Sequence, residues 1–268
     1  MGLPHPVLCL IVESHLKTMP ELNHSFITFL IVGFLAQFID GSLGMGQKVT
    51  STTFLLSLGV PPIFASASVH TAAIFTGAAS GAAHYQFGNR NRQLFKKLLI
   101  PGMIGGILGA ILLSHLPVEI IKPFVAIYLL AMGLRILYKS IGQQAYLFIG
   151  GNIRLIGFLG GFFDAIGGGG WGPIVTGTLI CNGYKAPVVI GTANMVEFFV
   201  SLVQATTFFT ILGTLNLTIV GGLIIGGVLA APIAAWLVRY LPTSKLMVAV
   251  GILIIILSLR TLLLTFTG

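Results

Sequence analysis

Charged residues are scarce in this chain of 268 residues. Asp, Glu, Lys and Arg together make up 7% of it, and only six residues are acidic. A soluble domain carries about 25% charged residues, so this chain has too few to cover a surface in water. Apolar types make up 56% of the chain, and the mean hydropathy is +1.02. The composition therefore indicates an all-helical, polytopic membrane protein and argues against a soluble enzyme.

Cysteine is also scarce, and so are long polar stretches. Cys9 and Cys181 cannot suggest a disulfide framework. Residues 1–24 lack the basic start, long apolar core and cleavage site of a signal peptide, so we interpret them as a tail. The basic residues lie in short loops such as 85–97 rather than on one stripe. We therefore expect their charge to set topology and attract anions, and we expect no binding to nucleic acid.

An internal repeat runs through the rest of the chain. The motif GFLAQFIDGSLGMG begins at Gly33, and GFLGGFFDAIGGGG begins 124 residues later at Gly157. Farther along, the matching positions are 125 residues apart, as for Arg135 and Arg260. Matches in frame at these two offsets indicate a duplicated unit. We predict an N-terminal tail (1–24), membrane repeat 1 (25–141) and membrane repeat 2 (142–268).

Each repeat contains four apolar segments, and an acid with several glycines interrupts the first of the four. As a helix, residues 25–39 would be about 23 Å long, which is shorter than the roughly 30 Å hydrocarbon core. A broken, re-entrant helix fits this length better than a full span. Each repeat would then cross three times, and the second repeat would be inverted relative to the first. The predicted segments are Ser25–Leu58, Ile63–His84, Leu94–Leu116, Val118–Tyr138, Gln144–Cys181, Ala186–Leu212, Leu215–Tyr240 and Ser244–Phe266.

The distribution of basic residues favours this inverted arrangement. If loop 85–97 lies in the cytoplasm, the inverted scheme places most other Lys and Arg on the same side, as the positive-inside rule requires. Counting the broken segments as full spans would move Lys185, Arg239 and Lys245 to the outside.

The glycine-rich breaks predict a backbone-lined anion site. A half-helix that begins after a break presents free N–H groups and a positive dipole end, which suit an anion. Glycine lets this backbone approach a ligand without obstruction by Cβ. Inverted repeats with broken helices in matching positions are typical of secondary transporters, in which the substrate binds near the bilayer midplane.

Two nucleotide-binding motifs arise here by coincidence. Gly167, Gly169 and Gly172 match the G-x-G-x-x-G spacing, but that motif requires a soluble βαβ unit. The sequence GSLGMGQK resembles a phosphate-binding loop, but Gln47 stands where the lysine belongs. We expect no cofactor, no metal site and no catalytic residue.

Three acids lie well inside apolar segments, where charges are costly and usually functional. Asp40 and Asp164 occupy equivalent breaks. Each would either cap the half-helix that follows or carry a coupling proton, and we favour the cap. Glu197 has Ala73 at its repeat-related position, which makes it the better candidate for a proton carrier. A hydrogen-bonded structural role for Glu197 competes equally.

Polar residues at matching points of the two repeats predict a central cavity. His70 and Asn194 are equivalent, and they would line this cavity or bond one helix to another; we favour lining, because their symmetry coincides with the breaks. Lys48, just past the first break, would contact an anion or extend to an interface. The predicted substrate-binding residues are Ser42, Gly44, Gly46, Gln47, Lys48, His70, Thr71, Gly168, Gly169, Gly170, Trp171, Thr192 and Asn194.

The motifs AQFIDGSLGMG and GGFFDAIGGGGWGP, with LGVPPIFASASVHTA after the first, resemble those of the TauE/SafE sulfite exporter family. The resemblance covers nearly the whole chain after about residue 25. It implies a multi-pass transporter of the bacterial cytoplasmic membrane that moves sulfite, an organosulfonate or a related sulfur-containing anion. Transport would use alternating access, with coupling to protons left open. Gln47, Lys48 and Ala73 depart from the family pattern.

Two other classes compete with a transporter. An anion channel would share the same fold cues. An intramembrane aspartyl protease would need its acids in G-x-G-D and Y-D contexts, but Asp40 lies in FIDG and Asp164 in FFDA. The expected partners are a small anion and membrane lipids, and assembly into a homo-oligomer is left open.

Overall fold

The computed structural model describes residues 26–43, 46–86, 88–140, 152–237 and 243–267, and these residues are entirely helical where they are regular. The predicted tail 1–24 lies outside the described residues, as do 144–151 of the segment predicted to begin at Gln144. The helices are α2 (Phe26–Leu43), α3 (Gln47–Ser57), α4 (Pro62–Gln86), α5 (Arg92–His115), α6 (Val118–Ser140), α7 (Ile153–Gly167), the π-helical turn η1 (Gly172–Thr176), α8 (Gly177–Cys181), α9 (Ala186–Leu212), α10 (Leu217–Leu237) and α11 (Thr243–Thr267).

Several helices have the length and composition of membrane spans. Among the described residues, four stretches are long and apolar enough to cross a bilayer: Pro62–Ala82, Arg92–His115, Glu119–Tyr138 and Val188–Leu212. Shorter apolar helical stretches are Phe26–Asp40, Leu217–Ala230 and Gly251–Phe266. The chain is thus a polytopic helical membrane protein, as its composition indicates.

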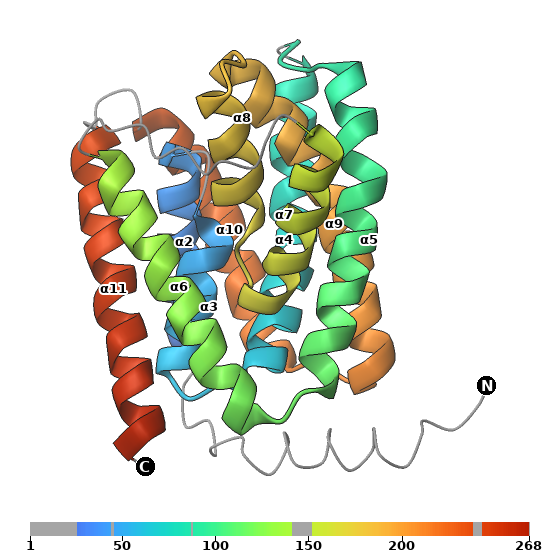
Figure 1. Ribbon diagram of the computed structural model, residues 1–268. Coiled ribbons are helices and arrows are strands. Elements are labelled where there is room, and N and C mark those ends of the chain that lie inside the picture. Colours follow the sequence, from blue (N-terminus) through green and yellow to red (C-terminus); the bar gives the residue numbers. More distant parts are fainter. Residues whose placement is uncertain (1–25, 44–45, 87, 141–151, 238–242, 268) are drawn as a thin grey trace.

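The helices pack as a bundle in which α2 lies along α10, α5 along α7, α4 along α9 and α6 along α11 (Figure 1). Small residues bring these pairs together. An added Cβ at Gly105 of α5 would collide with the carbonyl oxygen of Phe158 in α7, and one at Gly226 of α10 with that of Leu30 in α2. In lipid, where the hydrophobic effect does not drive helix association, such close backbone packing stabilises the pairs.

The breaks fall later than the sequence predicts. We expected the first helix to stop before Asp40, but α2 continues through Asp40 to Leu43. Likewise α7 continues through Asp164 and ends at Gly167. The signal that ends α7 is Gly168, which adopts the left-handed conformation (φ 62°, ψ 30°). The acids therefore lie in the last turn before each break rather than in the break itself.

Candidate functional site

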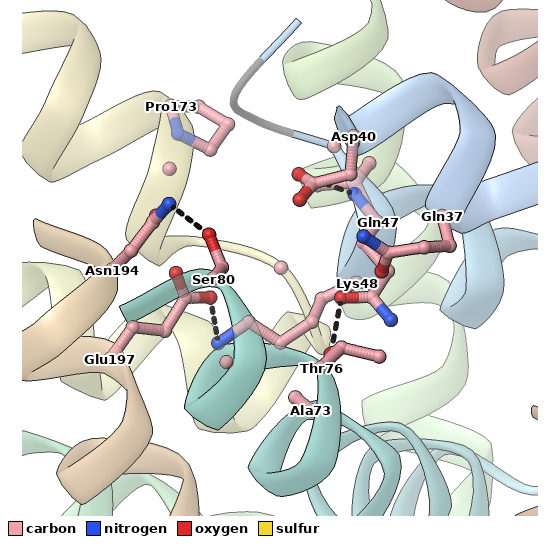
Figure 2. A pocket seen from close by; sticks show the side chains of 15 residues that line it. Gln37, Asp40, Gln47, Lys48, Ala73, Thr76, Ser80, Pro173, Asn194 and Glu197 are labelled. Carbon is pink, nitrogen blue, oxygen red and sulfur yellow. Dashed lines mark hydrogen bonds and ion pairs between the residues drawn. The ribbon is translucent and has the colours of Figure 1, made fainter. Parts of the chain in front are cut away.

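A small polar cavity lies where the two breaks meet α4 and α9 (Figure 2). Its volume, taken as the space open to the centres of water molecules, is about 30 Å³. One water needs roughly 10–15 Å³ of such space, so the cavity has room for about two waters. Its lining residues are Gln37, Asp40, Gly46, Gln47, Lys48, Val49, Ala73, Thr76, Gly77, Ser80, Gly169, Gly172, Pro173, Asn194 and Glu197.

Lys48 is the central charge of this cavity. Its Nζ lies 2.5 Å from Oδ2 of Asp164 and 2.7 Å from Oε1 of Glu197. The three side chains come from α3, α7 and α9, and Figure 2 shows the lysine reaching toward Glu197. The Lys48 side chain is 5% exposed and that of Asp164 is fully buried, whereas Glu197 is 22% exposed. Desolvated charges require partners of opposite sign, and here one cation is shared by two carboxylates.

The two equivalent acids also bond across the breaks. Oδ1 of Asp40 accepts a hydrogen bond from the backbone N–H of Gln47, at 3.3 Å. Oδ1 of Asp164 accepts one from the backbone N–H of Trp171, at 3.0 Å. In each case the donor lies seven residues after the acid, at the start of the next helical segment. These bonds satisfy N–H groups that no preceding turn can satisfy.

The carbonyl end of α7 is satisfied by side chains of α3 and α4. Nε2–H of His70 donates to the carbonyl oxygen of Asp164 at 3.1 Å. Ser66 donates to the carbonyl of Ala165 at 2.5 Å, and Thr52 to that of Gly168 at 3.0 Å. Terminal carbonyls buried in a membrane protein need such partners, because no solvent replaces them. His70 is fully buried in this role and does not line the cavity.

Gly169 allows the two breaks to touch. A Cβ at this position would lie 2.6 Å from Cα of Val49 and closer still to its backbone nitrogen, in the first turn of α3. The second break therefore packs directly on the N-terminal turn of α3, where Lys48 is attached. Any side chain at Gly169 must move that turn and change the site.

The structure gathers part of the predicted site. Gly46, Gln47, Lys48, Gly169 and Asn194 line the cavity together with Asp40 and Glu197, whereas Gly44 lies outside the described residues and only the backbone of Ser42 is described.

The other predicted binding residues lie outside the lining of the cavity and bond or pack elsewhere. The indole N–H of the buried Trp171 donates to the carbonyl of Ala193, at 3.1 Å. Thr71 bonds within its own helix, and Thr192 accepts from the backbone N–H of Asn91. Gly168 and Gly170 pack within the break, with no place in the lining of the cavity.

Three polar lining residues were not predicted: Gln37, Thr76 and Ser80. Thr76 donates to Oε1 of Gln47 at 3.0 Å, and Ser80 accepts from Nδ2 of Asn194 at 2.8 Å. The sequence contains a signal for Thr76 and Ser80, because Ala73, Thr76 and Ser80 have the i, i+3, i+7 spacing of one helical face. Ala73, at the start of that face, is the residue equivalent to Glu197.

Relatives of the chain are membrane transporters by name. It is 42% identical over 246 residues to the probable membrane transporter protein YtnM of Bacillus subtilis, covering 88% of this chain and 82% of the relative. A probable membrane transporter protein of Haemophilus influenzae is 30% identical, covering 75% of this chain and 81% of that protein. No solved structure matches the chain.

The family model "Sulfite exporter TauE/SafE" matches residues 29–261, a range that includes both breaks and every described residue of the cavity. This match confirms the resemblance seen in the motifs. The protein is therefore a multi-pass membrane transporter rather than an enzyme, and it belongs to the TauE/SafE family.

Proposed function

We propose that this protein is a secondary transporter that moves a small sulfur-containing anion, sulfite or an organosulfonate, by alternating access and together with protons. The observation that carries the proposal is Lys48, held between Asp164 and Glu197 in the cavity. The family name supplies the substrate class. The buried lysine supplies the cation that an anion needs at membrane depth.

The charge balance of the site requires a proton for anion binding. Asp164 and Glu197 share the single lysine of the cavity lining, and Asp40 lines the same cavity, so an anion entering the fully ionised site would meet excess negative charge. Protonation of Glu197 removes one charge and releases one side of Lys48 for an oxygen of the substrate. Glu197 is the acid for this exchange because its side chain is 22% exposed, whereas Asp164 is fully buried. A lower pH on the substrate side then favours binding, and proton and anion move in the same direction.

We further propose that residues 25–141 and 142–268 are two inverted repeats. Helices α4 and α9 begin 124 residues apart, at Pro62 and Ala186, and α6 and α11 begin 125 apart, at Val118 and Thr243. The packing is symmetric under exchange of the two proposed repeats. Helix α2 of the first packs on α10 of the second, and the helix equivalent to α2, α7, packs on α5 of the first. In Figure 1 the connection between α5 and α6 and the C-terminal end lie at one end of the bundle, and α8 lies toward the other.

The proposed repeats place the charged groups asymmetrically. The position equivalent to Lys48 is Gly172, and the position equivalent to Glu197 is Ala73. All four line the cavity. Each long charged side chain is thus matched by a small residue in the other repeat, which leaves room for one ion pair across the interface.

We also propose that both broken segments are re-entrant. Helix α7 has 15 residues, which span about 23 Å, less than the roughly 30 Å of hydrocarbon. After the break, η1 packs against α7. A hairpin that turns near mid-depth accounts for both observations, and it brings the start of η1 to the cavity.

Flux into proteoliposomes tests the proposed function. The panel is sulfite, thiosulfate, sulfoacetate, sulfate and acetate, each with and without a proton gradient. We expect saturable accumulation of at least one sulfur-containing anion, driven by acid on the side of addition. Flux that does not saturate and does not respond to the gradient would instead indicate a channel.

Glu197→Gln tests the role of the acid. The variant keeps a hydrogen-bonding side chain but cannot exchange a proton, so substrate binding should persist while flux loses its dependence on the proton gradient. The comparison is made at equal amounts of inserted protein and at two or more external pH values. An unchanged pH dependence would leave Glu197 a structural acid.

A further inference from the structure

A basic pocket lies at the turn between α4 and α5, outside the polar cavity that contains Lys48. It has a volume of about 580 Å³ and is lined by Tyr85, Arg90, Asn91, Arg92, Phe95 and Lys96, with Thr192 and Met195 of α9. The guanidinium of Arg90 lies 4.0 Å from the centre of the Tyr85 ring, a cation–π contact that orients it. Arg90, Arg92 and Lys96 are all exposed. The pocket therefore offers three accessible cations to an anionic group.

An apolar groove continues from this pocket along the outer surface of α4 and α9. Its volume is about 430 Å³, and Tyr85 and Met195 line both the groove and the basic pocket. The floor is formed by small residues of α4, and Phe198 and Phe199 of α9 form a wall. Ala78 and Ala82 are exposed in it. On a membrane protein an exposed apolar groove of this kind faces hydrocarbon rather than water.

We propose that this groove and pocket bind one anionic phospholipid, with its phosphate at Arg90, Arg92 and Lys96 and an acyl chain in the groove. A small inorganic anion would use the basic pocket alone and leave the groove unexplained. A neutral lipid would fill the groove without using the cations. A molecule with a negative head and an apolar chain matches both parts, and basic pockets between membrane helices are known to bind such lipid headgroups.

The groove also reaches the wall of the polar cavity. Gly77 of α4 lines both the apolar groove and the polar cavity. A bound acyl chain therefore lies against the helix that carries Thr76 and Ser80 into the cavity. The lipid site itself does not depend on the proposed transport function, because it rests on residues outside the ion-pair cluster.

Native mass spectrometry of the protein released from nanodiscs of mixed phosphatidylglycerol and phosphatidylcholine tests the proposal. The wild-type protein should retain phosphatidylglycerol in preference to phosphatidylcholine. In the triple variant Arg90→Gln, Arg92→Gln, Lys96→Gln, this preference should fall by at least about tenfold, because basic residues at the membrane surface attract anionic lipids. Ala82→Phe fills the groove without changing charge, and it should also release the lipid.

Matched controls separate the site from general effects. Lys97→Gln removes a neighbouring exposed cation that lines neither pocket, and Ala79→Phe adds the same ring to an exposed position of α4 outside the groove. Both should retain phosphatidylglycerol as the wild type does. Displacement of the lipid by inorganic phosphate would overturn the proposal in favour of a small-anion site. If the wild-type protein forms a dimer and Ala82→Phe disrupts it, the groove binds a second copy of the chain rather than a lipid.

Discussion

The two repeat-related aspartates have unequal roles at the level of single residues. Asp164 accepts from the N–H of Trp171, pairs with Lys48 at 2.5 Å and offers its carbonyl to His70. Asp40 accepts a longer bond, at 3.3 Å, from the N–H of Gln47. An amide oxygen can replace a carboxylate as the acceptor of a backbone N–H. It cannot replace the negative charge that Lys48 requires.

We therefore expect Asp164→Asn to destabilise the protein more than Asp40→Asn does. The first substitution weakens a buried charge-assisted bond, which contributes about 1.5–3 kcal/mol, although Glu197 still compensates part of the lysine charge. The second keeps its cap and should cost less than about 1 kcal/mol. Unfolding by a denaturing detergent in mixed micelles measures both. Equal losses in the two variants would show that the ion pair adds little to stability.

At the level of elements, glycines decide which helices can touch. Helices α5 and α7 meet where Gly105 faces the carbonyl of Phe158. Helices α4 and α9 are less tightly joined, because a Cβ at Gly81 would lie 3.6 Å from Cα of Met195, an ordinary contact. The same residue type therefore has different consequences in the two pairs.

Gly105→Ala and Gly81→Ala form a matched test of this difference. The first must push α5 away from α7 and should lower the free energy of unfolding by about 1–3 kcal/mol. The second should be neutral or stabilising by up to about 1 kcal/mol, because alanine is the better helix former. Thermal unfolding of the purified proteins measures both shifts. A destabilising Gly81→Ala variant would mean that α4 and α9 are packed more closely than described.

Contact between the breaks is a second element-level feature with a functional consequence. Gly169→Val would drive a branched side chain into the first turn of α3 and displace Lys48. We expect this variant to insert in the membrane but to lose transport, and we expect the same of Gly170→Val, which would collide with the backbone at Asp164. Flux at matched insertion is the measurement. If either variant transports at the wild-type rate, transport does not depend on this break.

For the whole molecule, the main question is which connections share a side of the membrane. The proposed inverted repeats place the α4–α5 turn and Lys185 on the cytoplasmic side. They place the α9–α10 connection, which contains Thr214, on the opposite side.

Single-cysteine labelling in a background without Cys9 and Cys181 tests this topology. Gln93→Cys, Lys185→Cys and Thr214→Cys lie at exposed positions, and Gln93 is preferable to Asn91, whose side chain caps α5. We expect an impermeant reagent added outside to label position 214 but neither 93 nor 185. Labelling of 185 from outside, with 93 protected, would rule out the inverted arrangement.

The sequence alone determined the class of the protein, most helix positions and the family. Hydrophobic runs are local features, so the predicted segment Ala186–Leu212 coincides with α9. The duplicated motifs pointed to both breaks, to Asp40 and Asp164 within them and to Lys48 just past the first. Glu197 was conspicuous as an acid inside an apolar segment. Membrane depth makes each buried charge conspicuous, because an apolar chain has few of them.

Only the tertiary structure decided how these residues combine. Lys48 and Glu197 have no charged residue at the positions equivalent to them in sequence, so the symmetry that located the breaks gave no reason to pair them. His70 and Asn194 are equivalent in sequence, yet His70 satisfies the end of α7 and Asn194 lines the cavity. Which donor meets which carbonyl depends on how α3 and α4 cross the second break. A hydrogen bond is directional and short-ranged, so its partner depends on three-dimensional packing between segments distant in sequence.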